Sequence, residues 1–245
     1  MATLITENDI KDIITELSKE RNAFWSEADF QYSFAWKLQQ KYEGAKIRLE
    51  KRHNHSISRD LKSDSEAAQE DLQKEPYYVD IWVEMDNSIY PIELKYKTRA
   101  EVMPDVDGDN ITLLNQSAQD LGRYGYIKDI KRIENIIEDY TEKEKTVQKG
   151  FAIMLTNDPS YYTIPSPNRP INSLDKMFRI HQGTVNKPNI LQGELFWSDK
   201  QSNPITQTGH WTQKYPSLRL NGSYNIMWHL YKENTSLHYC VTTIH

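Results

Sequence analysis

The stretch of residues 77–97, YYVDIWVEMDNSIYPIELKYK, constrains the fold most strongly because it alternates like two strands joined by a polar turn. Apolar residues take every second position from 79 to 85, and Ile92 and Leu94 repeat this spacing after the turn. Side chains of successive strand residues point to opposite faces. The pattern therefore predicts a β-hairpin with one apolar face.

The opposite face of this hairpin carries Asp80, Glu93 and Lys95. With a two-residue turn at Asp86-Asn87, Ile81 opposes Ile92, and Asp80 opposes Glu93. Two carboxylates placed about 5 Å apart at Cβ repel each other unless a cation lies between them. The register therefore predicts a cation site on the hairpin.

Oxygen ligands of this kind suit Mg²⁺, which takes one or two carboxylates together with waters and a substrate phosphate. Asp80 and Glu93 are the expected ligands, and the carbonyl of Leu94 is a further oxygen donor. Lys95 is expected to hold an attacking water or to stabilise charge that develops on the phosphorus. Hydrolysis of a phosphodiester is the reaction that these groups suit best. The competing explanation is a solvent-facing Asp80 beside a weak Glu93–Lys95 salt pair.

The remaining chain predicts an α/β fold with a mixed central sheet flanked by helices. Helical spacing is found in residues 7–19, from Ser26 onward, and in residues 112–140, whereas AKIRLEKRH and GFAIMLTND are typical of strands. We expect a single domain, residues 1–245, whose core spans about 20–156 and 223–245. Residues of about 157–222, rich in proline, are expected to be an insertion, which FRIHQG and GELFWS enter as short strands, and the C-terminus is expected to form a β-hairpin.

Composition limits the class of protein and of partner. The chain has 245 residues, a net charge of −5 and one cysteine, Cys240, which is expected in the core. It has neither an apolar run of 18 residues nor a signal-like N-terminus, so we expect a cytoplasmic protein without a membrane partner. Because phosphate-binding proteins are commonly basic, contacts with DNA must come from local patches or from a metal.

Asp80, followed after twelve residues by Glu93-Leu94-Lys95, resembles the signature of the PD-(D/E)XK (restriction-endonuclease-like) nuclease superfamily. The resemblance covers roughly residues 20–156 and implies an αβββαβ core. It also implies that Asp80 and Glu93 bind metal and that Lys95 is catalytic. Val79 stands at the usual proline position, and Pro91 precedes the centre of the second strand, where proline favours an edge position.

Further site residues follow from the resemblance and from the charge pattern. Glu27 matches an extra metal-binding acidic residue that some branches carry on the first core helix; the alternative is a first-turn carboxylate favoured by the helix dipole. Gln116 or Gln119 could match a glutamine found on the helix after the motif in recombination-type exonucleases. The candidates for substrate contacts are Arg48, Lys51, Arg52, Lys97, Arg99, Gln116, Gln119 and Arg123.

Together these features predict a Mg²⁺-dependent DNA endonuclease of defence or repair, in which Mn²⁺ could substitute for Mg²⁺. By analogy with the family, a homodimer is expected, since cutting both strands needs two sites. The alternative is a non-catalytic module that binds nucleic acid or protein and retains the nuclease fold, which the acidic composition favours.

Overall fold

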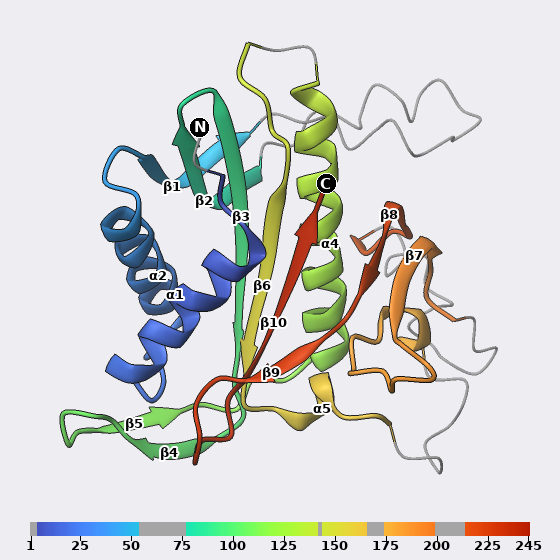
Figure 1. The fold of residues 1–245 in the computed structure, drawn as a ribbon. Coiled ribbons are helices and arrows are strands. Elements are labelled where there is room, and N and C mark those ends of the chain that lie inside the picture. Colours follow the sequence, from blue (N-terminus) through green and yellow to red (C-terminus); the bar gives the residue numbers. More distant parts are fainter. Residues whose placement is uncertain (1–3, 54–76, 142–143, 166–173, 199–213) are drawn as a thin grey trace.

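The computed structural model describes residues 4–53, 77–141, 144–165, 174–198 and 214–245. These residues form a six-stranded sheet with helices on both faces (Figure 1). In spatial order, its strands are β1 (Lys46–His53), β2 (Tyr77–Met85), β3 (Ser88–Lys97), β6 (Gly150–Thr156), β10 (His238–Ile244) and β9 (Trp228–Leu230). Strands β3 and β6 pair in parallel, while the other neighbours are antiparallel, so the predicted mixed α/β sheet is confirmed.

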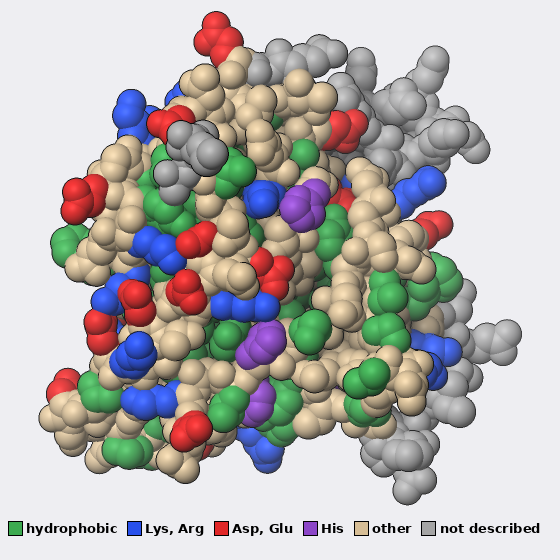
Figure 2. Space-filling model, viewed as in Figure 1, with side chains coloured by type: hydrophobic (Ala, Val, Ile, Leu, Met, Phe, Trp, Pro, Cys, Tyr) green, Lys and Arg blue, Asp and Glu red, His purple; other side chains and the backbone are tan. Residues whose placement is uncertain are grey.

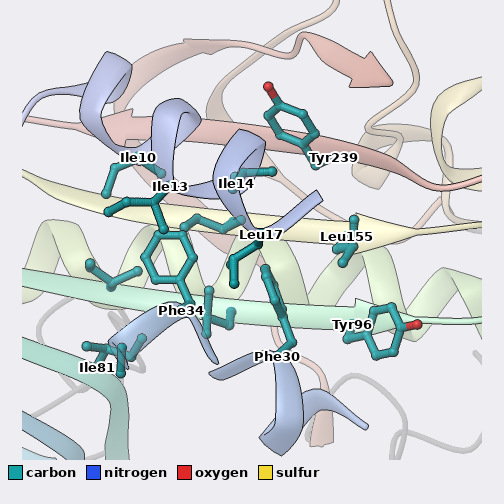
Figure 3. Packing of buried hydrophobic residues seen from close by; sticks show 14 of the residues in the cluster. Ile10, Ile13, Ile14, Leu17, Phe30, Phe34, Ile81, Tyr96, Leu155 and Tyr239 are labelled. Carbon is teal, nitrogen blue, oxygen red and sulfur yellow. The ribbon is translucent and has the colours of Figure 1, made fainter. Parts of the chain in front are cut away.

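Two helices cover one face of the sheet: α1 (Glu7–Glu20) and α2 (Glu27–Lys41). Helix α2 begins after Ser26, whose hydroxyl accepts a hydrogen bond from the backbone N–H of Asp29, as an N-cap does. Figure 3 shows isoleucines of α1 and phenylalanines of α2 packed against side chains from β2, β3, β6 and β10. This layer forms the larger apolar core. It covers the face of the sheet opposite to the face that carries the candidate catalytic residues.

Helix α4 (Gln119–Asp139) covers the other face and links β3 to its parallel neighbour β6 (Figure 1). We predicted this helix from residue 112, which is wrong. Residues Asn110–Leu113 form strand β5, which pairs with β4 (Glu101–Pro104) in a separate ribbon. The reason is a local period of two, because Ile111 and Leu113 are buried while Asn110 and Thr112 are exposed.

The hairpin has the predicted register, with Ile81 opposite Ile92 and Met85 opposite Ser88 across a two-residue turn. The ladder between β2 and β3 ends at Ile81 and Ile92, so Asp80 and Glu93 are not a ladder pair, contrary to the prediction. The two strands separate at this point. Their separation leaves one edge of β3 without a strand neighbour from Glu93 onward in the described part of the chain.

The alternation of β2 changes at Asp80. Ile81 and Val83 pack in the core below α1 and α2, whereas Val79 packs with Trp82 on the α4 side. On β1, Glu50 lies between the residues paired with Ile81 and Val79, and its φ of 50° breaks the regular extended backbone. Both strands are therefore locally irregular here. As a result, Asp80 does not lie on the face of the sheet that a strict two-residue alternation predicts.

Pro91 lies buried inside the sheet rather than at an edge, which corrects the expectation from its residue type. In β3 the N–H groups of Leu94 and Tyr96 point toward the β2 side, so the nitrogen of Pro91 points toward β6. The parallel ladder with β6 begins one residue later, at Ile92 and Phe151. The missing N–H of Pro91 therefore costs no ladder bond.

The described residues of the predicted insertion pack on α4; residues 166–173 and 199–213 of it lie outside the described ranges. The short helices α5 (Pro159–Tyr162) and η2 (Lys176–Phe178) and the strand pair β7 (Ile190–Leu195) and β8 (Leu218–Asn225) share an apolar cluster with α4, β6 and β10. GELFWS lies partly in β7, whereas FRIHQG forms no named strand. The C-terminal hairpin is confirmed as β9 with β10, although residues 223–225 belong to β8. Cys240 is buried and free, as expected.

Candidate active site

The candidate site lies along the edge of β3 that β2 leaves. Asp80 Oδ2 accepts a hydrogen bond of 2.6 Å from the backbone N–H of Leu94. Two residues further along the same edge, Glu27 Oε2 accepts one of 2.7 Å from the backbone N–H of Tyr96. The carboxylates of Asp80 on β2 and Glu27 on α2 thus accept the backbone hydrogen bonds that a neighbouring strand would otherwise accept. They bind β3 one residue before and one residue after Lys95.

Glu93 and Lys95 point to the opposite side of β3 from the α1–α2 core, toward α4. The Nζ of Lys95 lies 2.9 Å from Asp129 Oδ2, and Arg132 Nη1 lies 3.1 Å from the other oxygen of Asp129. Lys95 Nζ also donates a hydrogen bond of 3.2 Å to the carbonyl of Leu94. An added Cβ on Gly125 would lie 3.8 Å from Lys95 Cε, so the lysine stem passes close to α4 at a residue without a side chain.

Asp129 is a part of the site that sequence reasoning missed. It is 2% exposed and lies on the buried face of α4, between turns occupied by apolar side chains. An acidic residue at a core-facing helix position is the signal that could have found it, because a buried carboxylate needs a cationic partner. The spacing of the motif alone gives no indication of a residue on a helix 34 positions later than Lys95.

Four carboxylates act electrostatically on Lys95 and are called the carboxylate cluster below: Glu27, Asp80, Glu93 and Asp129. Burial lowers the pKa of Lys95, but attraction to the carboxylate cluster outweighs burial and raises that pKa above its ordinary value. The lysine is therefore held as an ammonium group. With Arg132, two cations face four carboxylates, so the site carries more acidic than basic groups when all of them are ionised.

Asp80 is a carboxyl of this cluster whose pKa is raised toward neutral pH. Burial raises its pKa from 3.8 to about 6, and the charges of Asp129 and Glu27 act in the same direction. Lys95 and the Leu94 N–H act against them. A carboxyl that is neither strongly acidic nor permanently protonated is sensitive to any cation that enters the site.

Glu93 is the least compensated carboxyl of the site. It is 2% exposed, and its Oε1 has no hydrogen-bond partner. Burial, followed by repulsion from Asp129 and Asp80, raises its pKa well above the usual range, against the attraction of Lys95 and Arg132. An orphaned buried carboxylate oxygen next to other carboxylates is the kind of group that a bound cation would satisfy.

Asp80 and Glu93 each have a carboxylate oxygen of the kind that Mg²⁺ binds. Glu93 Oε1 lacks a partner, one oxygen of Asp80 lies outside the Leu94 hydrogen bond, and the Leu94 carbonyl belongs to the same strand edge. Within the described ranges, no three side chains of His, Cys, Asp or Glu are grouped closely enough to hold a metal ion. The three-carboxylate set of Glu27, Asp80 and Glu93 is therefore not assembled, and Glu27 contacts the Tyr96 amide.

The candidate substrate-contacting residues fall into two groups. On β1, Arg48 pairs with Glu84, Lys51 Nζ lies 3.6 Å from the ring centre of Trp82, and Arg52 is exposed. The second group begins at the carboxyl end of β3 and continues beyond it, near the carboxyl end of β6. It consists of Lys97, Arg99, Gln116 and Gln119, with Arg99 and Gln116 exposed and Gln119 bonded to Asp158 at 3.2 Å.

Arg123 is not placed for contact with a substrate, which corrects the prediction. Its side chain is 3% exposed, forms an ion pair with Asp175 and donates to the carbonyl of Ser160 at 3.3 Å. The residue instead connects α4 to the region after β6. Sequence spacing put it on the same helix face as the glutamines, but the segment that covers this face was not visible in that pattern.

The surface charge is mixed. Figure 2 shows acidic and basic side chains interspersed over the α1–α2 side of the face in view, with no continuous basic area there. None of the family models, curated proteins and solved structures compared with the chain matches it. Among the helices in the described ranges, none is both long and apolar enough to cross a membrane.

Proposed function

We propose that this protein is a metal-dependent nuclease that hydrolyses phosphodiester bonds in DNA. The observation that carries the proposal is the buried, unpartnered carboxylate of Glu93, placed next to Lys95 and within the electrostatic reach of Asp80. The order α2, β1, β2, β3, α4, β6 supports it, because it follows the αβββαβ order that the motif resemblance implied, with the ribbon of β4 and β5 inserted between β3 and α4.

Each residue has a distinct part in this proposal. Glu93, Asp80 and the Leu94 carbonyl hold Mg²⁺, which supplies a Lewis acid and a source of nucleophilic water when bound. Lys95, kept charged by the carboxylate cluster, stabilises the charge that develops on the phosphate oxygens. Asp129, itself held by Arg132, sets the position of the Lys95 ammonium group. Glu27 supports the strand edge through Tyr96.

The acidic balance of the chain restricts how DNA would bind. A net charge of −5 and a mixed surface do not attract a polyanion over a broad area. Binding would depend on the bound metal and on two local groups, one on β1 and the other at and beyond the carboxyl end of β3. The steepness with which the affinity for DNA falls as salt is added should therefore be set by the number of these few cations that contact phosphates.

A non-catalytic binding module is the alternative function, and one observation favours it. Lys95 is engaged by Asp129, while Asp80 and Glu27 accept backbone amides of β3, so three of the motif-related groups already have structural partners. In that case the same residues would only stabilise the sheet edge. The orphaned oxygen of Glu93 has no place in such a role, and for that reason we favour the nuclease.

The test is cleavage of plasmid DNA, single-stranded DNA and RNA with Mg²⁺ or Mn²⁺, comparing the wild type with Glu93→Gln and Lys95→Met. Glu16→Gln, at an exposed position of α1, is the matched control. We expect both site variants to lose at least about a hundredfold in rate, as is usual for groups that stabilise a transition state, while the control is unchanged. Calorimetric titration with Mg²⁺ should show binding that Glu93→Gln removes. Absence of both cleavage and metal binding in the wild type would support the binding module.

A further inference from the structure

Helix α2 is apolar on two opposite faces. Its inner face packs Phe30, Phe34 and Leu38 into the core. Its outer face carries three large aromatic side chains that we call the aromatic stripe: Trp25, just before the helix, Tyr32 and Trp36, which are 60%, 59% and 66% exposed. A helix at a protein surface normally turns polar residues to solvent, and a helix that is apolar all round is normally covered on every side.

The aromatic stripe is continuous and borders a groove. Ala28, Tyr32 and Trp36 follow one another at a spacing of four, so the outer ridge of the helix is apolar over about two turns, and Trp25 lies just before the N-cap residue Ser26. A groove of about 350 Å³ runs beside the ridge, between α1 and α2. Leu17, Tyr32 and Trp36 form the apolar part of its walls, and the rest of its lining is polar or charged: Glu20, Arg21, Asp29, Ser33 and Lys37. Contiguous exposed apolar surface of this kind marks an interaction site more often than scattered single residues do.

We propose that the aromatic stripe of α2 is the contact through which two copies of this chain form a dimer. The interface would bring the two α2 helices together in antiparallel orientation around a twofold axis near Tyr32. Trp25 stands at one end of the stripe and Trp36 at the other, so this arrangement places each Trp25 against the Trp36 of the second copy. A twofold contact requires such a self-complementary surface.

The area is of the right order for a dimer. A fully covered aromatic side chain buries roughly 150–250 Å², so the exposed fractions of the three residues amount to roughly 280–460 Å². Stable interfaces bury about 800 Å² per partner. The stripe alone therefore supplies about 35–60% of the area that each copy needs, and tryptophan and tyrosine are the residue types that dominate such contacts.

Charge at the border favours a second copy over a nucleic acid. Arg21 pairs with Asp29 at 3.0 Å and Lys37 with Glu20 at 2.5 Å, so the cations near the stripe are already neutralised by carboxylates. Single-stranded nucleic acid stacks on aromatic side chains too, but it needs a positively charged groove beside them. A neutral border also keeps two copies of a chain with net charge −5 from repelling each other at the contact.

The test is the oligomeric state of the full chain, measured by light scattering and sedimentation velocity over a dilution series. Trp36→Glu and Tyr32→Glu change exposed positions of α2, and Leu114→Glu, at a residue 73% exposed next to β5, is the matched control. We expect the wild type and the control to dimerise, with Trp36→Glu weakening the dimer at least about thirtyfold, as for a tryptophan buried in an interface. Circular dichroism verifies that each variant is folded.

Two outcomes would overturn the proposal: a wild type that stays monomeric at all concentrations, or a dimer that persists in both stripe variants. Titration with single-stranded DNA adds a third measurement through tryptophan fluorescence. If the wild type is monomeric, single-stranded DNA quenches its tryptophan fluorescence and Trp36→Glu abolishes that quenching, the stripe would be assigned to base stacking instead. None of these readouts depends on cleavage, so failure of the proposed nuclease would leave this test intact.

Discussion

Replacing Asp80 by Asn should stabilise the protein at neutral pH. The pKa of Asp80 is raised from 3.8 to about 6, chiefly by burial, so the folded protein holds the proton of this carboxyl more tightly than the unfolded chain does. Folding is therefore unaffected by Asp80 below its unfolded pKa. Stability is lost as the pH rises from about 4 to about 6, and the loss is complete above that window.

The size of the effect follows from the shift. A difference of about two pKa units corresponds to about 3 kcal/mol of unfolding free energy at pH 7, at about 1.4 kcal/mol per unit. Asn at position 80 keeps an oxygen that can accept the Leu94 N–H, which now donates to Asp80 at 2.6 Å. Asp80→Asn should thus equal the wild type below pH 4 and exceed it by up to about 3 kcal/mol above pH 6.

Urea unfolding of both proteins at a series of pH values measures this difference. Asp12→Asn is the control, because Asp12 is exposed and lies 3.5 Å from Lys41, a surface pair that contributes little. The control should follow the wild type at every pH to within about 0.5 kcal/mol. The reasoning is refuted if Asp80→Asn is no more stable than the wild type at pH 7, or if its advantage does not depend on pH.

Two further substitutions test the packing around the site. Gly150→Ala would place a Cβ 2.7 Å from the carbonyl oxygen of Pro91, where β6 begins, and should lower the unfolding free energy by about 1–3 kcal/mol. Gly44→Ala is the control and should be tolerated, because no atom lies within 4 Å of the added Cβ. Thermal unfolding of both variants measures the difference. Arg123→Met removes one of the two guanidinium groups that pair with the buried Asp175, leaving Arg179 at 3.4 Å, and should cost about 1–3 kcal/mol by urea unfolding. An unchanged midpoint in either core variant would contradict the described packing.

Local sequence patterns predicted the hairpin well because its determinants are local. Alternating apolar residues and a two-residue turn are sufficient to set Ile81 opposite Ile92, and the structure has that register. The end of the ladder at this pair could not be predicted in the same way. It depends on the irregularity at Glu50 and Asp80, which involves a strand that is distant in sequence.

The charges that complete the site also come from tertiary contacts. Asp129 reaches Lys95 only because α4 packs across β3, and Arg123 is buried only because the region after β6 covers that face. Helical periodicity shows which positions of α4 are apolar, but it does not show which strand residue a buried aspartate meets. Similarly, Pro91 is allowed inside the sheet because β6 begins one residue later, which a residue-type rule for proline does not include.

The distribution of partners within the carboxylate cluster separates its structural from its functional members. Asp80 and Glu27 each accept an amide of β3 that would otherwise lack a partner, so these two carboxylates stabilise the strand edge whether or not the protein is an enzyme. Glu93 has one oxygen without a partner and a pKa well above the usual range because of burial and of Asp129 and Asp80. A purely structural site would be served better by a neutral side chain at position 93, because a buried, uncompensated carboxyl lowers stability at neutral pH. The function of this site should therefore depend most on Glu93, and a Glu93→Gln variant that is both more stable and unable to bind Mg²⁺ would be the expected sign of that dependence.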